Sequence, residues 1–254
     1  MNLYEAIFSR KSVRSFTNEA VSEEILDKIR EQFNQILAPF GKVKADYSVL
    51  DNRKGQLRML SMFSVKAPYY LAFYSDQSRK HMMNIGYLME EMVLFLTTLG
   101  LGTCFIGSRR VKKDDQTKGD LSLVGLVAFG HAKGDVYRKS VDASRLPMDE
   151  ICIFKEVPRQ WMQQLLEAAR LAPSALNSQP WRFVVYDNRI HIFCKKHKAE
   201  NMTPREELEF GIMLANLQVA SEELWLDVDL IKLENIEQKT FPNNQYVLSA
   251  VMKA

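Results

Sequence analysis

Cysteine is scarce in this sequence, and the few cysteines are placed where they exclude two common uses of the residue. The 254 residues include Cys104, Cys152 and Cys194, which lie far apart in apolar surroundings. There is no CxxC pair, and no histidine stands at a spacing typical of a zinc site. A disulfide framework needs paired cysteines, and structural zinc needs clustered cysteine or histidine ligands. We therefore expect neither of them, and no metal site.

Long apolar runs and a strong net charge are also missing. No stretch of about 18 apolar residues occurs, and residues 1–14 lack the apolar core of a signal peptide. The formal net charge is +3, and the densest basic runs, at 109–113 and 195–198, are short. We therefore expect a cytoplasmic protein that binds neither membranes nor nucleic acid.

The remaining composition is that of a globular protein. Hydrophobic residues make up 46% of the chain and charged residues 26%, which suits one large domain or two small ones. The sequence has no G-x-S-x-G motif, and its four histidines fit no Ser-His-Asp or Cys-His arrangement. No side chain is therefore expected to act as a catalytic nucleophile or base.

The sequence resembles itself at a shift of about 125 residues. Gly86 and Gly211 stand near the starts of two helical patterns, 85–99 and 212–224, with apolar residues at i, i+3, i+4 and i+7. Each pattern is preceded by a shorter helix that ends in Ala-Pro and is followed by two strand-like stretches. The shorter helices are 25–37 and 161–171, and the strand-like stretches are 103–106 and 121–129 in one copy and 228–233 and 246–253 in the other.

Two interpretations of this self-similarity remain open. Helices and strands recur in any α/β protein, and a gene duplication would give the same pattern. The matched order of elements favours duplication, so we expect two half-domains, 1–150 and 151–254, with the boundary near 149–158. The helical patterns also predict that Trp161 and Trp225 lie in the core.

The two halves differ in a complementary way. The second half has a polar segment at 173–177, where the first half has only Ala38-Pro39-Phe40-Gly41. The first half has a cationic turn at 10–16, and the second half has no such turn at 153–157. One complete site shared between two half-domains would have this pattern.

The cationic turn holds three positive charges and a hydroxyl within five residues. It runs Arg10-Lys11-Ser12-Val13-Arg14 after a predicted helix at 3–9. Alternate side chains of an extended segment share one side, so we expect Arg10, Ser12 and Arg14 to point together. Forked guanidinium donors and a hydroxyl suit a phosphate group. A solvated basic turn is the alternative that the spacing leaves open.

The polar segment lies between a helical pattern at 161–170 and a strand at 183–186. Pro173 stops the helix, and the serine, asparagine, glutamine and second proline that follow favour an extended conformation. Such a segment offers backbone amides and short side chains to a flat heteroaromatic ligand. A polar loop without any ligand has the same composition, so this alternative also remains.

Both segments resemble motifs of the nitroreductase family. A-P-S-A-x-N-x-Q-P-W-x-F at 172–183 resembles the family's flavin-edge loop, and R-x-S-x-R-x-F at 10–16 resembles its site for the FMN phosphate and ribityl chain. Residues 99–107 resemble the segment where a strand passes the flavin ring, and 144–147 resemble a basic segment that follows a late strand. The resemblance implies that FMN is bound by Arg10, Lys11, Ser12, Arg14, Ile106, Gly107, Arg145, Pro173, Ser174, Ala175, Leu176 and Asn177.

Ordinary members of that family are single-unit chains that dimerise, whereas both units here lie on one polypeptide. The sequence is therefore identified as a member of the branch described as putative TM nitroreductases, which resembles a fused pseudo-dimer. The resemblance implies an α+β fold of two nitroreductase-like half-domains with one FMN at their junction. It also implies a monomer, or at most a weak dimer.

The implied function is that of an FMN-dependent oxidoreductase. The protein would take a hydride from NAD(P)H and reduce a nitroaromatic, a quinone or a similar small electron acceptor, with the flavin supplying the chemistry. The degenerate second site leaves one alternative, which is a flavin-binding protein or sensor without turnover.

Overall fold

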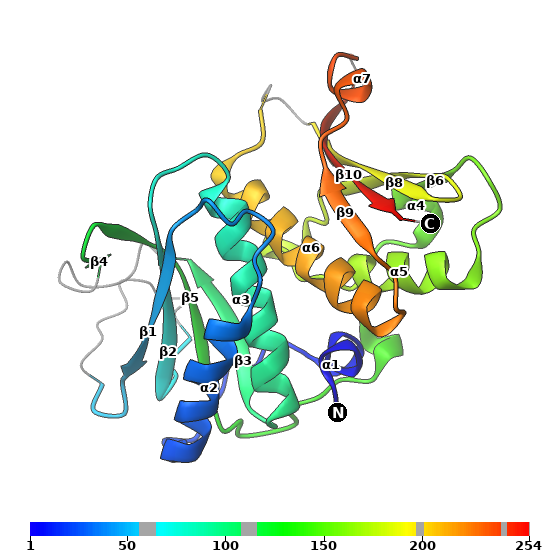
Figure 1. Ribbon diagram of the computed structural model, residues 1–254. Coiled ribbons are helices and arrows are strands. Elements are labelled where there is room, and N and C mark those ends of the chain that lie inside the picture. The colour runs from blue at the N-terminus through cyan, green and yellow to red at the C-terminus, as the bar shows by residue number, and fades with distance from the viewer. Residues whose placement is uncertain (56–64, 108–115, 197–200, 240–242, 254) are drawn as a thin grey trace.

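Two long helices cross at the centre of the molecule, between two β-sheets (Figure 1). They are α3 (His81–Thr98) and α6 (Pro204–Glu223). The computed structural model describes residues 1–55, 65–107, 116–196, 201–239 and 243–253. None of the helices within these ranges has the length and apolar character that crossing a membrane requires.

The two sheets repeat one strand order around the two central helices. The first has the order β1-β2-β5-β3, and the second has the order β7-β8-β10-β9, all antiparallel. The first sheet consists of β1 (Ala45–Asp51), β2 (Tyr69–Ser75), β3 (Gly102–Gly107) and β5 (Leu121–Gly130), with β4 (Thr117–Lys118) beside β5. The second consists of β7 (Trp181–Val185), β8 (Arg189–Lys195), β9 (Val228–Ile231) and β10 (Asn244–Met252), and β6 (Cys152–Phe154) adds to β7 in parallel. The order therefore agrees with the self-similarity of the sequence.

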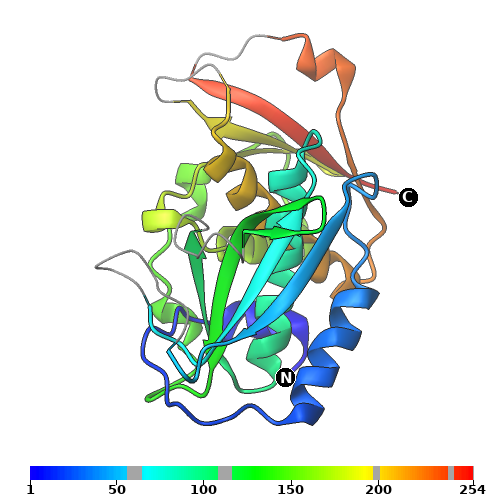
Figure 2. The ribbon, with the colours of Figure 1, turned by 90° about the vertical axis from the view of Figure 1, so that its left-hand side faces the viewer.

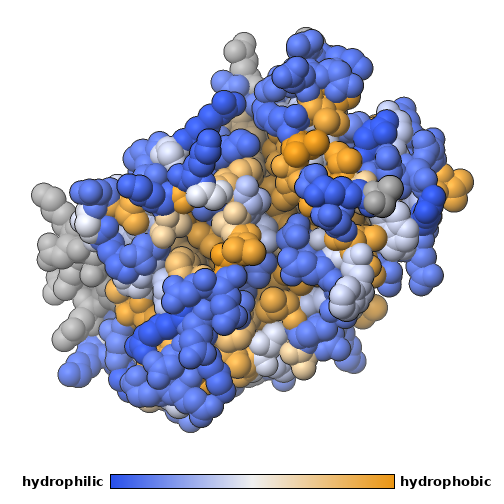
Figure 3. All heavy atoms as spheres, in the orientation of Figure 1, coloured by the Kyte–Doolittle hydropathy of each residue, from blue (hydrophilic) through white to orange (hydrophobic). Residues whose placement is uncertain are grey.

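The shorter helices cover the edges of this arrangement. They are α1 (Leu3–Ser9), α2 (Glu23–Gln35), α4 (Met148–Ile151), α5 (Gln160–Arg170) and α7 (Glu234–Glu237), with 3₁₀ turns η2 (Ser140–Asp142) and η3 (Ala175–Asn177). The helix α2 is amphipathic, because Leu26 and Ile29 are buried while its outer surface is hydrophilic (Figure 3). Figure 2 looks onto the face of the first sheet opposite to α3.

Capping residues explain where two helices begin. The hydroxyl of Ser22 accepts from the N–H of Ile25, so α2 starts two residues before the predicted apolar pattern. Thr203 and Glu206 form a capping box around Pro204, which starts α6 eight residues before the predicted position. The first two turns of α6 are rich in charge, so the apolar periodicity alone did not include them.

Gly86 and Gly211 allow α3 and α6 to approach each other backbone to backbone. A Cβ atom on Gly86 would lie 2.0 Å from the carbonyl oxygen of Leu208, and one on Gly211 would lie 1.9 Å from that of Met83. Gly86 therefore faces Leu208, three positions before Gly211, and Gly211 faces Met83, three positions before Gly86. This reciprocal contact is what an approximate twofold axis between the helices would produce.

The C-terminal ends of the two central helices also match. Gly100 and Trp225 both have positive φ, +75° and +55°, immediately after the helix cap. The N–H of Leu101 donates to Leu96 O at 3.0 Å, and that of Leu226 donates to Ser221 O at 2.8 Å, which gives both ends a Schellman motif. The prediction that Trp225 lies in the core is wrong. Its side chain is 95% exposed, because the left-handed cap position turns it out of the helix.

Two buried clusters fill the spaces between helices and sheets. One joins α1, α5 and α6 to the inner face of the second sheet, and the other joins α2 and α3 to the inner face of the first sheet. Trp181 and Phe210 pack edge to face in the first cluster, and Trp181 is fully buried. This tryptophan fixes the end of the polar segment that precedes β7.

Candidate functional site

The cationic turn is held against the edge of the first sheet. The guanidinium of Arg138 donates to Phe8 O at 2.8 Å and to Ile7 O at 3.2 Å, which closes the C-terminal end of α1. The chain then pairs with β3, where the N–H of Val13 donates to Thr103 O at 2.8 Å. The turn therefore extends the first sheet beyond β3.

Burial differs along the turn. Arg10 is only 5% exposed, Lys11 and Ser12 are half-buried, and Arg14 is exposed. Burial raises the pKa of the Cys104 thiol, and the positive charges of Arg14 and then Arg10 oppose this rise. Both arginines therefore lie near that thiol. Arg10 is thus the cation of this turn that points into the protein.

The polar segment at 173–177 is a strained loop that α6 holds in place. Leu176 and Asn177 have φ of +55° and +57°, a region that costs L-residues about 1–2 kcal/mol each. The carboxylate of Glu209 accepts from Ala175 N at 2.9 Å and from the hydroxyl of Ser178 at 3.2 Å. The side chain of Leu176 is 96% exposed. The loop therefore presents a large apolar side chain to solvent from a fixed backbone.

Arg145 connects this loop to the residues that precede α4. Its Nη1 donates to Asn177 Oδ1 at 3.0 Å, and its Nη2 donates to Leu171 O at 3.0 Å. Asn177 Nδ2 in turn donates to Ser144 O at 3.0 Å. A second link is the N–H of Leu146, which donates to Gln179 Oε1 at 2.8 Å. The position of Arg145 and the shape of the loop are thus fixed together.

Glu90 of α3 brings the two arginines together. Its carboxylate is fully buried, and its Oε1 lies 3.9 Å from Arg10 Nε. Burial raises the pKa of Glu90, the positive charges of Arg10 and then Arg145 oppose this rise, and the resulting pKa is about 7. Within the described part of the chain, both oxygens of Glu90 and the Nε atoms of both arginines have no hydrogen-bond partner. Three elements therefore converge on polar atoms that remain unsatisfied.

The cations around Glu90 crowd one another. Burial, followed by the charges of Arg10 and Arg138, lowers the pKa of Arg145 to about 10. Burial and the charge of Arg10 likewise lower the pKa of Arg138 to about 10. Asp142 and Glu167 offset part of the charge of Arg138, while the charges of Arg10 and Arg145 both act on the carboxylate of Glu90. The site is therefore suited to an anion with several acceptor oxygens.

Ile106 and Gly107 lie at the end of β3, the strand that carries the turn. Ile106 is 8% exposed and packs with Val13 and Leu126, so its side chain belongs to the core. Gly107 pairs with Gly125 at the last position of the strand. What these two residues can offer a ligand is therefore their backbone.

Several residues of the site are absent from the sequence-based prediction. These are Glu90, Arg138 and Glu209, and each contacts groups that lie far from it in the sequence. Glu90 interrupts the apolar pattern of α3, and this interruption was a usable signal, because a carboxylate in a buried helix needs a partner. The bonds of Arg138 and Glu209 depend on tertiary packing.

We expect Glu90→Gln to change how stability depends on pH. The pKa of Glu90 is raised from 4.5 to about 7 in the folded chain, so the folded state holds this proton more tightly than the unfolded state. The carboxyl therefore removes stability as the pH rises between those two values, by up to about 3 kcal/mol. Urea denaturation of wild type and variant at about pH 5 and about pH 8 measures this. Relative to the wild type, the variant should have a higher free energy of unfolding at about pH 8 than at about pH 5. The same difference in free energy of unfolding at both pH values would contradict the expectation.

Comparison with known proteins gives one family. Residues 2–221 match the family model described as putative TM nitroreductase. A crystal structure of a putative nitroreductase from Thermotoga maritima MSB8 is similar with a TM-score of 0.66 and 22% identity, over 99% of this chain and 94% of that chain. This likeness confirms the α+β nitroreductase fold.

Two further solved structures match over a smaller part of this chain. A nitroreductase family protein from Clostridium difficile 630 has 17% identity and a TM-score of 0.49, over 62% of this chain and 100% of that one. An FMN-dependent nitroreductase from Clostridium difficile R20291 has 20% identity and a TM-score of 0.45, over 57% and 97%. Among curated proteins, none matches the sequence.

Proposed function

Since this chain belongs to the putative TM nitroreductase family, we propose that it is an FMN-dependent oxidoreductase. It would take a hydride from NAD(P)H and reduce a nitroaromatic, a quinone or a similar small electrophile. The observation that carries the proposal is the pair of buried, unpartnered Nε–H donors of Arg10 and Arg145 around Glu90. A phosphate monoester offers such donors several charged acceptor oxygens at once, so the residues present fit the phosphate end of FMN.

The proposed binding site uses residues from both halves of the chain. Arg10 and Arg145 would hold the phosphate, with Ser12, Lys11 and Arg14 at the ribityl side. The backbone of Ile106 and Gly107 would lie against the ring, and Pro173, Ser174, Ala175, Leu176 and Asn177 would line its edge. When bound, FMN accepts a hydride from the nicotinamide and passes electrons to the acceptor.

The protein's own contribution is positioning and charge. The N–H of Ala175 donates to the carboxylate of Glu209, and the N–H of Asn177 donates to Ser174 O. The loop therefore keeps its shape without a ligand. A phosphate dianion between the two arginines would compete with Glu90, whose raised pKa allows it to take up a proton at that moment. No side chain of the site needs to act as a general acid in this account.

We further propose that the chain is an internal pseudo-dimer of two half-domains, 1–150 and 151–254. The shared strand order, the matching Schellman motifs and the reciprocal contacts of Gly86 and Gly211 support this. Arg10 and Arg145 then come from the first half and the Leu176 loop from the second. The surface by which single-unit relatives would dimerise is used within the chain, so binding of FMN should require no second copy.

We expect Leu176→Ala to weaken FMN binding about fivefold, because roughly 1 kcal/mol of apolar burial against the ring is lost. The matched control is Leu37→Ala, which removes the same atoms from a side chain that is 90% exposed and directly precedes the corresponding segment of the first half, 38–41. Fluorescence titration with FMN compares the two variants. Equal affinities would show that Leu176 does not contact the flavin.

The test of the proposed function is steady-state turnover. The protein is reconstituted with FMN, and NADH or NADPH oxidation is followed with menadione or nitrofurazone as acceptor. Turnover that requires FMN is the expected result. A bound flavin that light reduces, but that neither nicotinamide reduces under anaerobic conditions, would contradict it and would support the non-catalytic flavin protein instead.

A further inference from the structure

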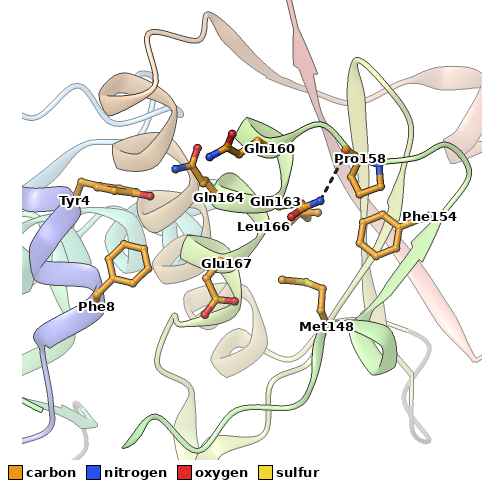
Figure 4. Close-up of a pocket in the computed structure, with 10 residues that line it drawn as sticks. All are labelled: Tyr4, Phe8, Met148, Phe154, Pro158, Gln160, Gln163, Gln164, Leu166 and Glu167. Carbon is orange, nitrogen blue, oxygen red and sulfur yellow. Dashed lines mark hydrogen bonds between the residues drawn. The ribbon is translucent and has the colours of Figure 1, made fainter. Parts of the chain in front are cut away.

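A second cavity lies between α1, α5 and the segment that contains β6 (Figure 4). Its volume is about 640 Å³, which falls within the range of small-molecule sites. The residues that form the flavin site proposed above do not line it. Its described lining consists of Tyr4, Phe8, Met148, Phe154, Pro158, Gln160, Gln163, Gln164, Leu166 and Glu167.

Aromatic and apolar groups form the walls of this cavity. Tyr4 and Phe8, one turn apart on α1, meet edge to face with ring centroids 5.0 Å apart. Phe154 and Pro158 stand on the opposite side, as Figure 4 shows. Phe154 is 38% exposed although it is a large apolar residue. Aromatic side chains thus stand at two ends of the cavity and offer apolar surface to a flat ring.

The polar groups of the cavity are mostly uncharged. Gln160, Gln163 and Gln164 carry amide groups on the first turns of α5, and burial raises the pKa of Tyr4, so its hydroxyl stays protonated. The one charged residue among the described lining is Glu167. Both of its oxygens accept from Arg170, at 2.6 and 2.7 Å. Among the described lining residues there is thus no cation for an anionic ligand, and the one carboxylate is already paired.

The walls are held in position without a ligand. Arg170 also donates to Leu146 O at 3.1 Å, and this fixes the bidentate pair with Glu167. Gln163 Nε2 donates to Pro158 O at 3.2 Å, which ties the first turn of α5 to the segment directly before it. A cavity that is already ordered binds a ligand with little further loss of conformational entropy.

We propose that this cavity is a second binding site, distinct from the flavin site, for an uncharged planar aromatic ligand that carries an amide or carbonyl group. The ring lies between the Tyr4–Phe8 pair and Phe154. The polar substituent exchanges hydrogen bonds with the glutamine amides, which both donate and accept. An anionic ring of the same shape is excluded, because it would leave its charge without a partner beside Glu167.

The test uses 2-naphthamide as the probe and 2-naphthoate as its charged counterpart. Each is titrated into the protein with FMN at saturation, and binding is followed by ligand-observed NMR. Any binding to the open face of the flavin is distinguished by the cavity variants, which leave the proposed flavin site unchanged. The amide should bind and the carboxylate should not. Phe154→Ala should weaken binding of the amide roughly tenfold through the loss of one aromatic wall.

The matched control for Phe154→Ala is Ile231→Ala. Phe154 and Ile231 lie in the two edge strands of the second sheet and are 38% and 40% exposed. Ile231→Ala should leave binding of the amide unchanged. Gln164→Ala removes one amide from the partly exposed rim and keeps the test valid if Phe154→Ala fails to fold. Failure of the amide to bind, equal binding of the carboxylate, or wild-type binding in both cavity variants would overturn the proposal.

Discussion

Replacing Gly86 or Gly211 with alanine should destabilise the protein by at least about 3 kcal/mol, beyond the usual range for an overpacked core. The new methyl group would lie 2.0 or 1.9 Å from a backbone carbonyl oxygen of the facing helix. A backbone carbonyl cannot rotate away as a side chain does, so α3 and α6 must separate along their whole contact. Urea denaturation followed by circular dichroism measures the loss.

Two other glycines provide the control for this prediction. A Cβ atom on Gly41 or Gly134 would have nothing within 4 Å. Alanine at these positions should change stability little, or raise it slightly by restricting the unfolded chain. If the Gly86 and Gly211 variants proved as stable as these controls, the central helices could not be packed as described. The pseudo-twofold arrangement built on that packing would then fail as well.

The second large effect concerns the arginines around Glu90. Arg10→Ala should weaken FMN binding by roughly 1.5–3 kcal/mol, the usual loss for a hydrogen bond to a charged group. Riboflavin lacks the phosphate and should bind this variant and the wild type equally. Isothermal titration with both ligands measures the two affinities. The riboflavin affinity also reports whether the variant is folded.

Arg145→Ala should behave differently, because this side chain also holds the loop through Asn177 and Leu171. It should weaken the binding of FMN and of riboflavin together. The double variant should lose at least about a hundredfold in FMN affinity. Arg30→Ala, on the exposed face of α2, is the control and should change neither affinity. An unchanged FMN affinity in Arg10→Ala would refute the phosphate assignment.

Local sequence signals predicted much of the fold because the corresponding interactions are local or repeated. The shift that aligned Gly86 with Gly211 also aligns the two Schellman motifs, whose hydrogen bonds connect equivalent residues. Periodicity found the cores of α3 and α6 but not the charged first turns of α6, which a capping box defines. It also placed Trp225 in the core, since the pattern cannot show that a residue has taken the left-handed cap position.

The site was harder to predict, because its central contacts join residues far apart in the chain. The sequence singled out Arg10, Arg145 and the polar loop as candidates for the site. In the structure, Glu90 stands beside both arginines. The expectation that Arg10, Ser12 and Arg14 point together rested on regular alternation. In the structure they differ in burial, from 5% exposure at Arg10 to an exposed Arg14, because the turn bends from α1 into the edge of the sheet.

The most direct measurement of the central claim is the stoichiometry of FMN binding. The claim is that Arg10 and Arg145 of the first half and the Leu176 loop of the second half form one site within one chain. Absorbance of the reconstituted, desalted protein, combined with sedimentation to determine its mass, gives flavin per chain and assembly state together. The account predicts about one FMN per chain on a monomer. Two FMN per chain, no FMN after reconstitution, or FMN held only by a dimer would contradict it.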